Sequence, residues 1–335
     1  MGRGFLRGFF KENKDNRLTG SLQEIIDKIL SRKLSDIKIS SFLVFLKYHR
    51  SPYTFGKAID VLRSKVEKVD LFLPDSVEVG YPYPMKEKSP YFMIASAVVL
   101  SLLPKSEIKA VFHGDNTGRS STKDIFDYLG ITLLTNEDSE NMLKNLNIGF
   151  FNRALFLPSL SDLNGLREEL NIKDLFSYTE RFVNPVSSMY HVTGSGSLNV
   201  EFYKEILRDR YKRFGIVVGG GEFPDVVGRS KLIICTDEIL KQYDIEIDDF
   251  RLEKKFSSKD HADFLTDLLG KKLPQYEKYL FINGAVLLLV RGFTDSIEEG
   301  YKITQDLFYS YDFSQILRNI QRYSDYLNYK NIYEI

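Results

Sequence analysis

The sequence predicts an α/β fold: a small N-terminal helical domain, then a large α/β domain with a central, mostly parallel sheet flanked by helices. The first 65 residues carry apolar side chains at the three-to-four spacing of amphipathic helices. After Asp70, short apolar runs alternate with helical segments, which favours a sheet covered on its faces. Of the 335 residues, 43% are hydrophobic and 27% charged, which suits a packed core. We place the helical domain at 1–67, joined in space by helices near 160–185, and the α/β domain at 68–335.

Three helices are predicted in the N-terminal part. Ser21 with Glu24 forms a capping box for the first helix, whose apolar residues follow at helical spacing. Ser35 caps the second helix, which stops before Ser51-Pro52 because proline disfavours helical backbone in the residue before it. Thr54 starts the third helix. Their short connections predict a compact helical unit.

The strands of the α/β domain are predicted from short apolar runs, at 69–73, 110–112, 148–155, 190–193, 214–218 and 231–235. Residues 74–90 are rich in proline, tyrosine and glycine, and an apolar helix follows at 91–103. A helix at 123–129 ends at Gly130, a favourable residue after a helix end. Near the C-terminus, 285–291 and 296–309 are predicted as two helices, or as one helix interrupted at Gly292.

Charge, cysteine content and hydropathy exclude several classes of protein. Lysine plus arginine and aspartate plus glutamate both total 46, so no global charge attracts nucleic acid or a membrane. A single cysteine, Cys235, excludes an intrachain disulfide framework and a thiolate metal site. The longest apolar stretches, 93–103 and 279–290, are shorter than the roughly 18 to 20 residues that cross a bilayer. Without a secretory signal pattern at the start of the chain, we expect a cytoplasmic protein with no membrane partner.

The densest polar cluster lies between a predicted strand and a predicted helix. Backbone N–H groups in such a turn, with a helix N-terminus behind them, favour an anion, and Arg119 adds a bidentate contact. The alternative is an ordinary polar loop whose serines and threonines cap the helix. His113 fits either a general base or phosphate ligand, or a hydrogen-bonded structural residue. The predicted anion-binding residues of this cluster are His113, Gly114, Asp115, Asn116, Thr117, Gly118, Arg119, Ser120, Ser121 and Thr122.

Two further sites are weaker candidates. Glu222 and Asp225 follow three glycines and could hold a magnesium ion that bridges phosphates, although the glycines alone suit a tight turn. Arg167 lies on a predicted helix, where a solvated residue on the polar face is the ordinary explanation.

The N-terminal segment interleaves basic and aromatic residues. Phe5, Phe9 and Phe10 lie among five basic residues, against only two acidic ones, Glu12 and Asp15. Such a segment suits an arm that binds single-stranded nucleic acid; the alternative is a solvated leader whose phenylalanines dock on the helical unit. The basic residues are Arg3, Arg7, Lys11, Lys14 and Arg17.

The order of these motifs resembles the anthranilate phosphoribosyltransferases of glycosyltransferase family 3, and with them the pyrimidine nucleoside phosphorylases. The resemblance covers most of the chain. It implies that Arg167 orients an acidic acceptor, because the family's arginine for the anthranilate carboxylate stands there. The matching segments are Phe112-His113-Gly114-Asp115 for Lys-His-Gly-Asn, residues 117–124 for the serine- and glycine-rich phosphate loop, residues 166–172, Phe182-Val183-Asn184-Pro185 for Leu-Thr-Asn-Pro, Asn283-Gly284-Ala285 and residues 295–300.

The departures from the family's pattern lie in the motifs that bind pyrophosphate and magnesium. Residues 80–84 replace the Gly-Thr-Gly-Gly-Asp loop that wraps pyrophosphate, leaving Gly80 as its remaining anion-binding candidate. Proline has no N–H for phosphate, and tyrosine crowds the close backbone approach that glycine permits. The family's Asn-x-Ser-Thr falls near residues 91–94, and its Asp-Glu magnesium pair is reduced to Asp225-Val226.

A Gly-Arg-Gly start and the changes above resemble a divergent, nucleic-acid-binding branch of this family. That resemblance implies a homodimer joined through the helical unit, with basic residues lining a groove. In a nucleic-acid-binding member, Lys47 and Arg50 would add phosphate contacts to those of the N-terminal segment. We therefore expect a non-catalytic or altered member that binds nucleic acid or another polyanion. The alternative is an active glycosyl- or phosphoribosyltransferase with an unidentified acceptor. Only in that case do we expect a donor such as phosphoribosyl pyrophosphate (PRPP) as ligand and magnesium as cofactor, with Asp225 as a weakened metal ligand.

Overall fold

A computed structural model describes residues 19–67, 72–82, 86–104, 108–115, 121–236 and 240–333. The predicted N-terminal basic residues, Arg3, Arg7, Lys11, Lys14 and Arg17, lie outside the described residues. So do five residues of the predicted anion loop, Asn116, Thr117, Gly118, Arg119 and Ser120.

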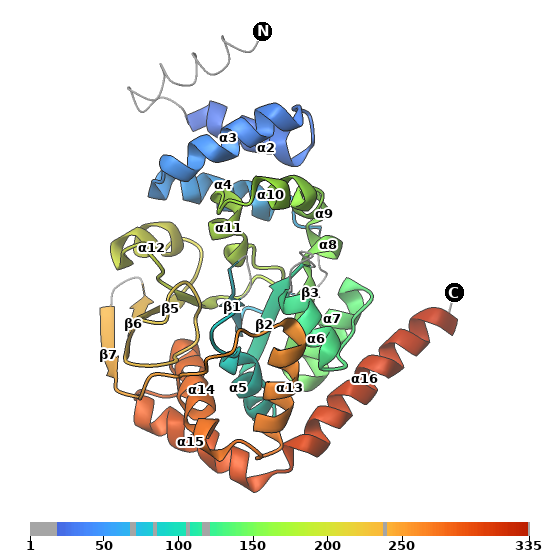
Figure 1. Ribbon diagram of the computed structural model, residues 1–335, viewed down its shortest axis with the longest axis vertical. Coiled ribbons are helices and arrows are strands. Elements are labelled where there is room, and N and C mark those ends of the chain that lie inside the picture. Colours follow the sequence, from blue (N-terminus) through green and yellow to red (C-terminus); the bar gives the residue numbers. More distant parts are fainter. Residues whose placement is uncertain are drawn as a thin grey trace.

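The centre of the fold is a seven-stranded, mostly parallel sheet, as predicted (Figure 1). The strand order is β3-β2-β1-β4-β5-β6-β7, and β6 runs antiparallel to both of its neighbours, whereas the other pairs are parallel. The chain returns from β3 at one edge to β4 beside β1, so β1 and β4 lie side by side in the middle. The strands are β1 Ser76–Gly80, β2 Lys109–Gly114, β3 Ile148–Asn152, β4 Tyr190–Gly194, β5 Arg213–Val218, β6 Ser230–Thr236 and β7 Leu240–Ile245.

The helical unit at one end of the molecule is made from two separate parts of the chain (Figure 1). The first part is α2 Thr19–Leu30, α3 Asp36–Tyr48 and α4 Pro52–Ser64. The second is α8 Arg153–Phe156, α9 Pro158–Ser161, α10 Asn164–Leu170 and α11 Leu175–Thr179, followed by a 3-10 turn, Glu180–Phe182. α10 contacts α3, and α11 contacts both α3 and α4.

The remaining helices pack around the sheet. They are α5 Phe92–Leu100, α6 Thr122–Tyr128, α7 Asn136–Leu146, α12 Val200–Leu207, α13 Ser258–Leu269, α14 Glu277–Arg291, α15 Ile297–Ser310 and α16 Phe313–Tyr333, with a 3-10 turn at Pro274–Tyr276. α14 and α15 are two helices rather than one, because Gly292 ends α14 in the left-handed conformation, with φ 78°. α5 is buried along its whole length and packs on α14.

Two hydrophobic cores lie on opposite faces of the sheet, because successive strand residues point to opposite faces. In β2, Ala110 and Phe112 join the core formed with α5, α13 and α14, whereas Val111 joins the other core. That second core also contains the apolar faces of α2, α3 and α4. The helical unit and one face of the sheet therefore share a single core, which fixes the unit over the strands.

The structure corrects several predicted boundaries. The strand expected at 69–73 is instead β1 at Ser76–Gly80; residues 69–71 lie outside the described part, and 72–73 are not in a strand. The first helix already includes Thr19, so Ser21 is not its N-cap. The third helix begins at Pro52, and Ser51, not Thr54, caps it by accepting the Thr54 N–H at 3.1 Å. The strand expected to reach residue 155 ends at Asn152, where the side chain of Asn152 caps α8.

No helix in the described ranges is long and apolar enough to cross a membrane.

The α14–α15 contact predicts opposite effects for two glycine substitutions. A Cβ at Gly284 would lie 2.4 Å from Thr304 Oγ1 on α15, whereas a Cβ at Gly165 on α10 meets nothing within 4 Å. We expect Gly284→Ala to destabilise the protein by about 1–3 kcal/mol, because the helices must separate. Gly165→Ala should stabilise it by about 0.5–1 kcal/mol through helix propensity. Urea denaturation measures both, and a neutral Gly284→Ala would contradict the close packing.

Candidate functional site at the carboxyl ends of the parallel strands

The candidate site lies where the carboxyl ends of the parallel strands face the helical unit. In open α/β sheets, ligands bind at this edge, next to the point where the strand order reverses. Here that point is the β1–β4 pair, from which the chain continues outward to β2 and β3 on one side and to β5 on the other. Three buried polar clusters occupy this region.

The first cluster surrounds Glu78, a fully buried carboxylate in the middle of β1. It accepts hydrogen bonds from His113 Nε2 on β2 at 2.9 Å and His191 Nδ1 on β4 at 2.8 Å. It also accepts the Asn184 N–H at 2.7 Å and the Tyr211 hydroxyl. Burial alone would raise the pKa of Glu78, but the histidine hydrogen bonds outweigh it and hold the pKa well below the usual range. Glu78 is therefore a charged centre that joins β1, β2 and β4.

This cluster explains the positions of His113 and Gly80. His113 is 4% exposed and bonded to Glu78, which fits the structural alternative for this histidine. Gly80 is packed against protein rather than open space, because a Cβ there would lie 2.6 Å from His191 Cε1 and 3.2 Å from the Arg181 carbonyl oxygen. Its lack of a side chain lets β1 approach its own neighbours closely.

The second cluster surrounds Asp225, which is also fully buried. Its Oδ1 accepts hydrogen bonds from the Tyr81 hydroxyl and from the Met93 N–H, both at 2.9 Å. Met93 lies in the first turn of α5, so a helix N-terminus also faces this carboxylate. The Lys86 ammonium is 2.9 Å from Oδ2, close enough for an ion pair, although its direction is poor for a hydrogen bond. Burial lowers the pKa of Lys86, and Asp225 opposes that shift.

Aromatic rings enclose the Asp225 cluster. The Tyr81 ring meets Tyr91 edge-on, with centroids 4.6 Å apart, and stacks on Phe112 at 6.2 Å. His261 lies edge-on to Tyr91 at 4.9 Å, and its Nε2 contacts the Lys86 carbonyl oxygen at 2.7 Å. Burial, reinforced by Asp225, raises the pKa of Tyr81, so its hydroxyl stays protonated and donates. The Tyr81 side chain therefore points into the interior.

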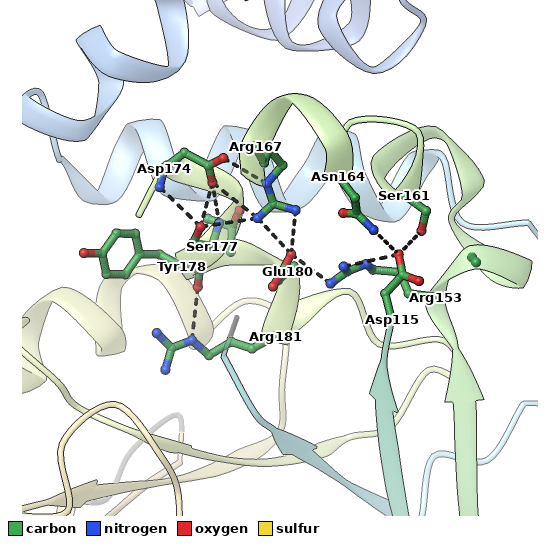
Figure 2. Close-up of polar contacts among 12 residues, drawn as sticks. Asp115, Arg153, Ser161, Asn164, Arg167, Asp174, Ser177, Tyr178, Glu180 and Arg181 are labelled. Atoms are coloured by element: carbon green, nitrogen blue, oxygen red, sulfur yellow. Dashed lines mark hydrogen bonds and ion pairs between the residues drawn. The ribbon is translucent and has the colours of Figure 1, made fainter. Parts of the chain in front are cut away.

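The third cluster is a buried ion network between the helical unit and the strand ends (Figure 2). Arg167 binds Asp174 at 2.9 Å and Glu180 at 3.2 Å. Arg153 binds the same Glu180 at 2.8 Å and reaches Asp115, after β2, at 3.4 Å. Each of these five side chains is at most 5% exposed. Arg167 is thus not the solvated residue that its position on a polar helix face suggested.

Arg181 lies next to this network but differs from its arginines. It is 1% exposed, yet it has no carboxylate within ion-pair distance among the residues that the structure describes. Its Nε donates to the Tyr178 carbonyl at 3.1 Å (Figure 2). Its Nη1 donates to the Glu222 carbonyl at 2.9 Å and the Thr193 hydroxyl at 3.2 Å. Arg181 therefore places an uncompensated positive charge at the ends of β4 and β5, where an anion is favoured.

The other predicted residues are scattered. Ser121 caps α6 in a capping box with Asp124, and Thr122 begins that helix. Gly114 ends β2, and a Cβ there would lie 3.2 Å from the Thr122 Cβ. Asp115 accepts from Asn164 Nδ2 at 2.8 Å and from the Ser161 hydroxyl.

Lys47 and Arg50 lie at the end of α3. The Arg50 guanidinium lies over the Tyr178 ring, 4.5 Å from its centroid. The Tyr178 carbonyl accepts a hydrogen bond from Arg181, so Tyr178 contacts both arginines.

Several participants were not singled out from the sequence. Glu78, Lys86 and Arg181 are among them, as are Arg153, Asp174, Glu180, His191, Tyr211 and His261. Two have a signal in the sequence, Glu78 and Arg181. Glu78 is a lone charge between Val77 and Val79, and Arg181 directly precedes the Phe182–Pro185 motif. Lys86 has no local signal. Within the described ranges, no group of three or more His, Cys, Asp or Glu residues could hold a metal ion.

Comparisons with known proteins find relatives over most of the chain. The glycosyl transferase family, a/b domain, matches residues 96–310. The anthranilate phosphoribosyltransferase of Caldicellulosiruptor saccharolyticus is 23% identical over 319 residues, covering 91% of this chain and 94% of that protein. That of Methanobrevibacter smithii is 23% identical over 325 residues, covering 90% and 93%.

Solved structures share the fold. Anthranilate phosphoribosyltransferase from Thermus thermophilus has a TM-score of 0.77 at 16% identity, covering 92% of this chain and 95% of that chain. The enzyme from Saccharomyces cerevisiae in complex with PRPP and Mg has a TM-score of 0.75 at 18% identity, covering 92% and 94%.

The ion network predicts a large effect for one substitution. Arg167→Ala should destabilise the protein by about 3–5 kcal/mol, because it leaves Asp174 and Glu180 buried with part of their counter-charge removed. Lys259→Ala is the control, since its ion pair with Asp263 is exposed and screened by solvent, so we expect little change in stability. Urea denaturation measures both. A loss below about 1 kcal/mol for Arg167→Ala would show that the network adds little.

The buried His261 predicts a loss of stability in acid. Burial lowers its pKa to about 3, whereas the unfolded chain has a histidine pKa of about 6.5. Between these values only the unfolded state takes up the proton, so stability falls as the pH drops from about 6.5 toward 3, by up to about 1.4 kcal/mol per pH unit. His261→Gln keeps a donor for the Lys86 carbonyl and should flatten this slope.

Chemical denaturation at several pH values measures the slope. Because burial also lowers the pKa of His191, part of the slope should remain in His261→Gln. The exposed His49 provides a matched control, His49→Gln. Equal slopes for wild type and His261→Gln would exclude His261 as a source of the acid sensitivity.

Proposed function

We propose a function from one premise: this chain belongs to the glycosyl transferase family whose a/b domain matches its residues 96–310. Within that family, its relatives include anthranilate phosphoribosyltransferases. We propose that this member does not use PRPP and magnesium as those enzymes do, because its own side chains close the site. We further propose that it binds nucleic acid or another polyanion.

The pairing of Asp225 carries the first half of the proposal. A carboxylate that holds magnesium must offer its oxygens to the metal. Here Oδ1 accepts two hydrogen bonds, and an ammonium lies 2.9 Å from Oδ2. A divalent cation would have to displace Lys86, and Tyr81 lies where the resemblance places the pyrophosphate loop. The site is thus neutralised from within the chain, and metal-assisted phosphoribosyl transfer has no open ligand at Asp225.

Unbalanced positive charge supports the second half. Arg181 is buried at the strand ends without a carboxylate partner in the described structure. The Arg50 guanidinium stacks on the ring of Tyr178, whose carbonyl accepts a hydrogen bond from Arg181. Lys47 lies in the last turn of α3, and Arg50 follows the helix, with its Nε donating to the Lys47 carbonyl at 3.0 Å. The basic and aromatic N-terminal segment lies outside the described residues, and its composition suits contacts to phosphates and bases.

The homodimer expected from the resemblance stays a prediction, for which α3 offers a surface. Ile37 is 80% exposed and Tyr48 is 75% exposed on that helix. Exposed apolar side chains of this size are typical of surfaces that a partner covers. Arg167 as an acceptor-binding residue also stays a prediction, and it belongs to the alternative of an active transferase. The proposed function does not use it, because its guanidinium is already bound by two carboxylates.

Salt-dependent binding tests this proposal. Fluorescence anisotropy with a labelled single-stranded DNA should show affinity at low salt that falls steeply as salt rises. Lys47→Ala combined with Arg50→Ala should lower the slope of log K against log salt by about 1.4, if each residue contacts one phosphate. Lys241→Ala combined with Lys302→Ala, both at exposed positions on β7 and α15, is the charge-matched control. Absence of binding at low salt would refute the nucleic-acid proposal.

Thermal melting with PRPP and magnesium separates the alternative. A ligand at 100 times its Kd stabilises the folded state by about 2.7 kcal/mol, which is visible as a higher Tm. We expect no shift at millimolar PRPP and magnesium. A clear shift that needs both components would favour an active transferase and overturn the closed-site proposal.

A further inference from the structure

The amino ends of β1 and β4, away from the Asp225 site, border a cavity of about 380 Å³. It lies between the last turn of α4, the segment 183–189 that leads into β4, and Arg210 just after α12. We infer that this cavity binds a small phosphorylated molecule that carries an aromatic group, with the chemistry of a nucleoside monophosphate. This inference does not depend on the proposed function.

The charge of the lining favours an anion. Arg63 and Arg210 line the cavity, and none of its lining residues is acidic. The Arg63 Nε donates to the Phe182 carbonyl at 2.8 Å, and its guanidinium lies over the Tyr211 ring, but no carboxylate pairs with it in the described ranges. Arg210 pairs with Asp60 at 2.5 Å, which neutralises only one of the two cations. A phosphate would supply the missing negative charge.

The wall beside these arginines is held in a fixed conformation. The backbone is left-handed at Asn184, with φ 53°, and at Ser187, with φ 57°. The Asn184 side chain accepts the Ser188 N–H at 2.7 Å and donates to the Ser188 carbonyl at 2.8 Å. Ser188 and Ser76 hydroxyls share a hydrogen bond of 2.6 Å. A wall that is already ordered lowers the entropic cost of binding a ligand.

The rim supplies the aromatic half of the site. Phe72 is 70% exposed and Met189 is 42% exposed, and both line the cavity. Two backbone hydrogen bonds hold their segments side by side: the Leu73 N–H to the Val186 carbonyl at 3.0 Å, and the Met189 N–H to the Pro74 carbonyl at 2.9 Å. An exposed ring next to two guanidiniums offers stacking for a planar group while the arginines hold the phosphate. The volume is in the range of small-molecule sites.

Binding of adenosine 5′-monophosphate to the full chain tests the inference. Isothermal titration calorimetry should show saturable binding, weaker by about tenfold or more for adenosine, which lacks the phosphate, and for ribose 5-phosphate, which lacks the ring. Arg63→Gln and Phe72→Ala should each weaken binding by about tenfold. The matched controls are Arg208→Gln and Tyr48→Ala. Arg208 is an exposed arginine at the C-cap of α12, and Tyr48 is an exposed ring on α3; neither lines the cavity. Both substitutions should change the affinity less than twofold.

Each result decides for or against the site. Arg63 also donates a hydrogen bond to the Phe182 carbonyl, so the affinity of Arg63→Gln is interpreted only if its Tm is unchanged. Phe72 is exposed, so Phe72→Ala still tests the site if Arg63→Gln unfolds. No saturable binding at millimolar nucleotide, equal binding of adenosine, or equal affinity of Phe72→Ala would overturn the inference. Single-stranded DNA binding, measured on the wild type and on Phe72→Ala, separates the two proposals. If DNA binds but the nucleotide does not, the inference about this cavity fails and the proposed function does not.

Discussion

The rest of this fold depends on keeping a charged carboxylate in the central strand of the sheet. Glu78 has no access to water, so every part of its charge must be met by protein donors. Those donors come from β2, from β4, from the backbone of Asn184 and from Tyr211, and each of those segments must hold its place for the charge to remain paired. Glu78 thus sets the spacing of three strands and anchors the segment that leads into β4.

A second set of charges fixes the helical unit over those strands. Arg153 follows β3, Arg167 lies on α10, and Glu180 binds both. The same chain segment then supplies Arg181, whose neighbours are carbonyl and hydroxyl oxygens. Neighbouring residues 180 and 181 therefore serve different purposes: the carboxylate completes a closed network, whereas the guanidinium leaves positive charge at the strand ends.

Local patterns in the sequence predicted the parts of the fold that depend on local physics. The apolar helix at α5, the strand around Val111 and the end of α6 at Gly130 follow from periodicity and capping, which involve residues a few positions apart. The clusters were not predictable in this way. His113 and Tyr211 are 35 and 133 positions from Glu78, and Tyr81 is 144 positions from Asp225.

A charge between two valines weakens the apolar run that marks a strand, which is why β1 was placed too early in the chain. The resemblance to a family suggested altered motifs, but it gave no sign that Tyr81 and Asp225 bond each other in the interior. That result depends on packing between distant segments.

The pairing of Lys86 with Asp225 also changes what the protein requires from its surroundings. A magnesium ion reaches a carboxylate from solution, so its occupancy follows the concentration that a cell maintains. A lysine in the same chain is present at a high and constant local concentration, because it cannot diffuse away. The neutralisation of Asp225 is therefore encoded by the gene and stays the same when the mineral supply of the cell changes.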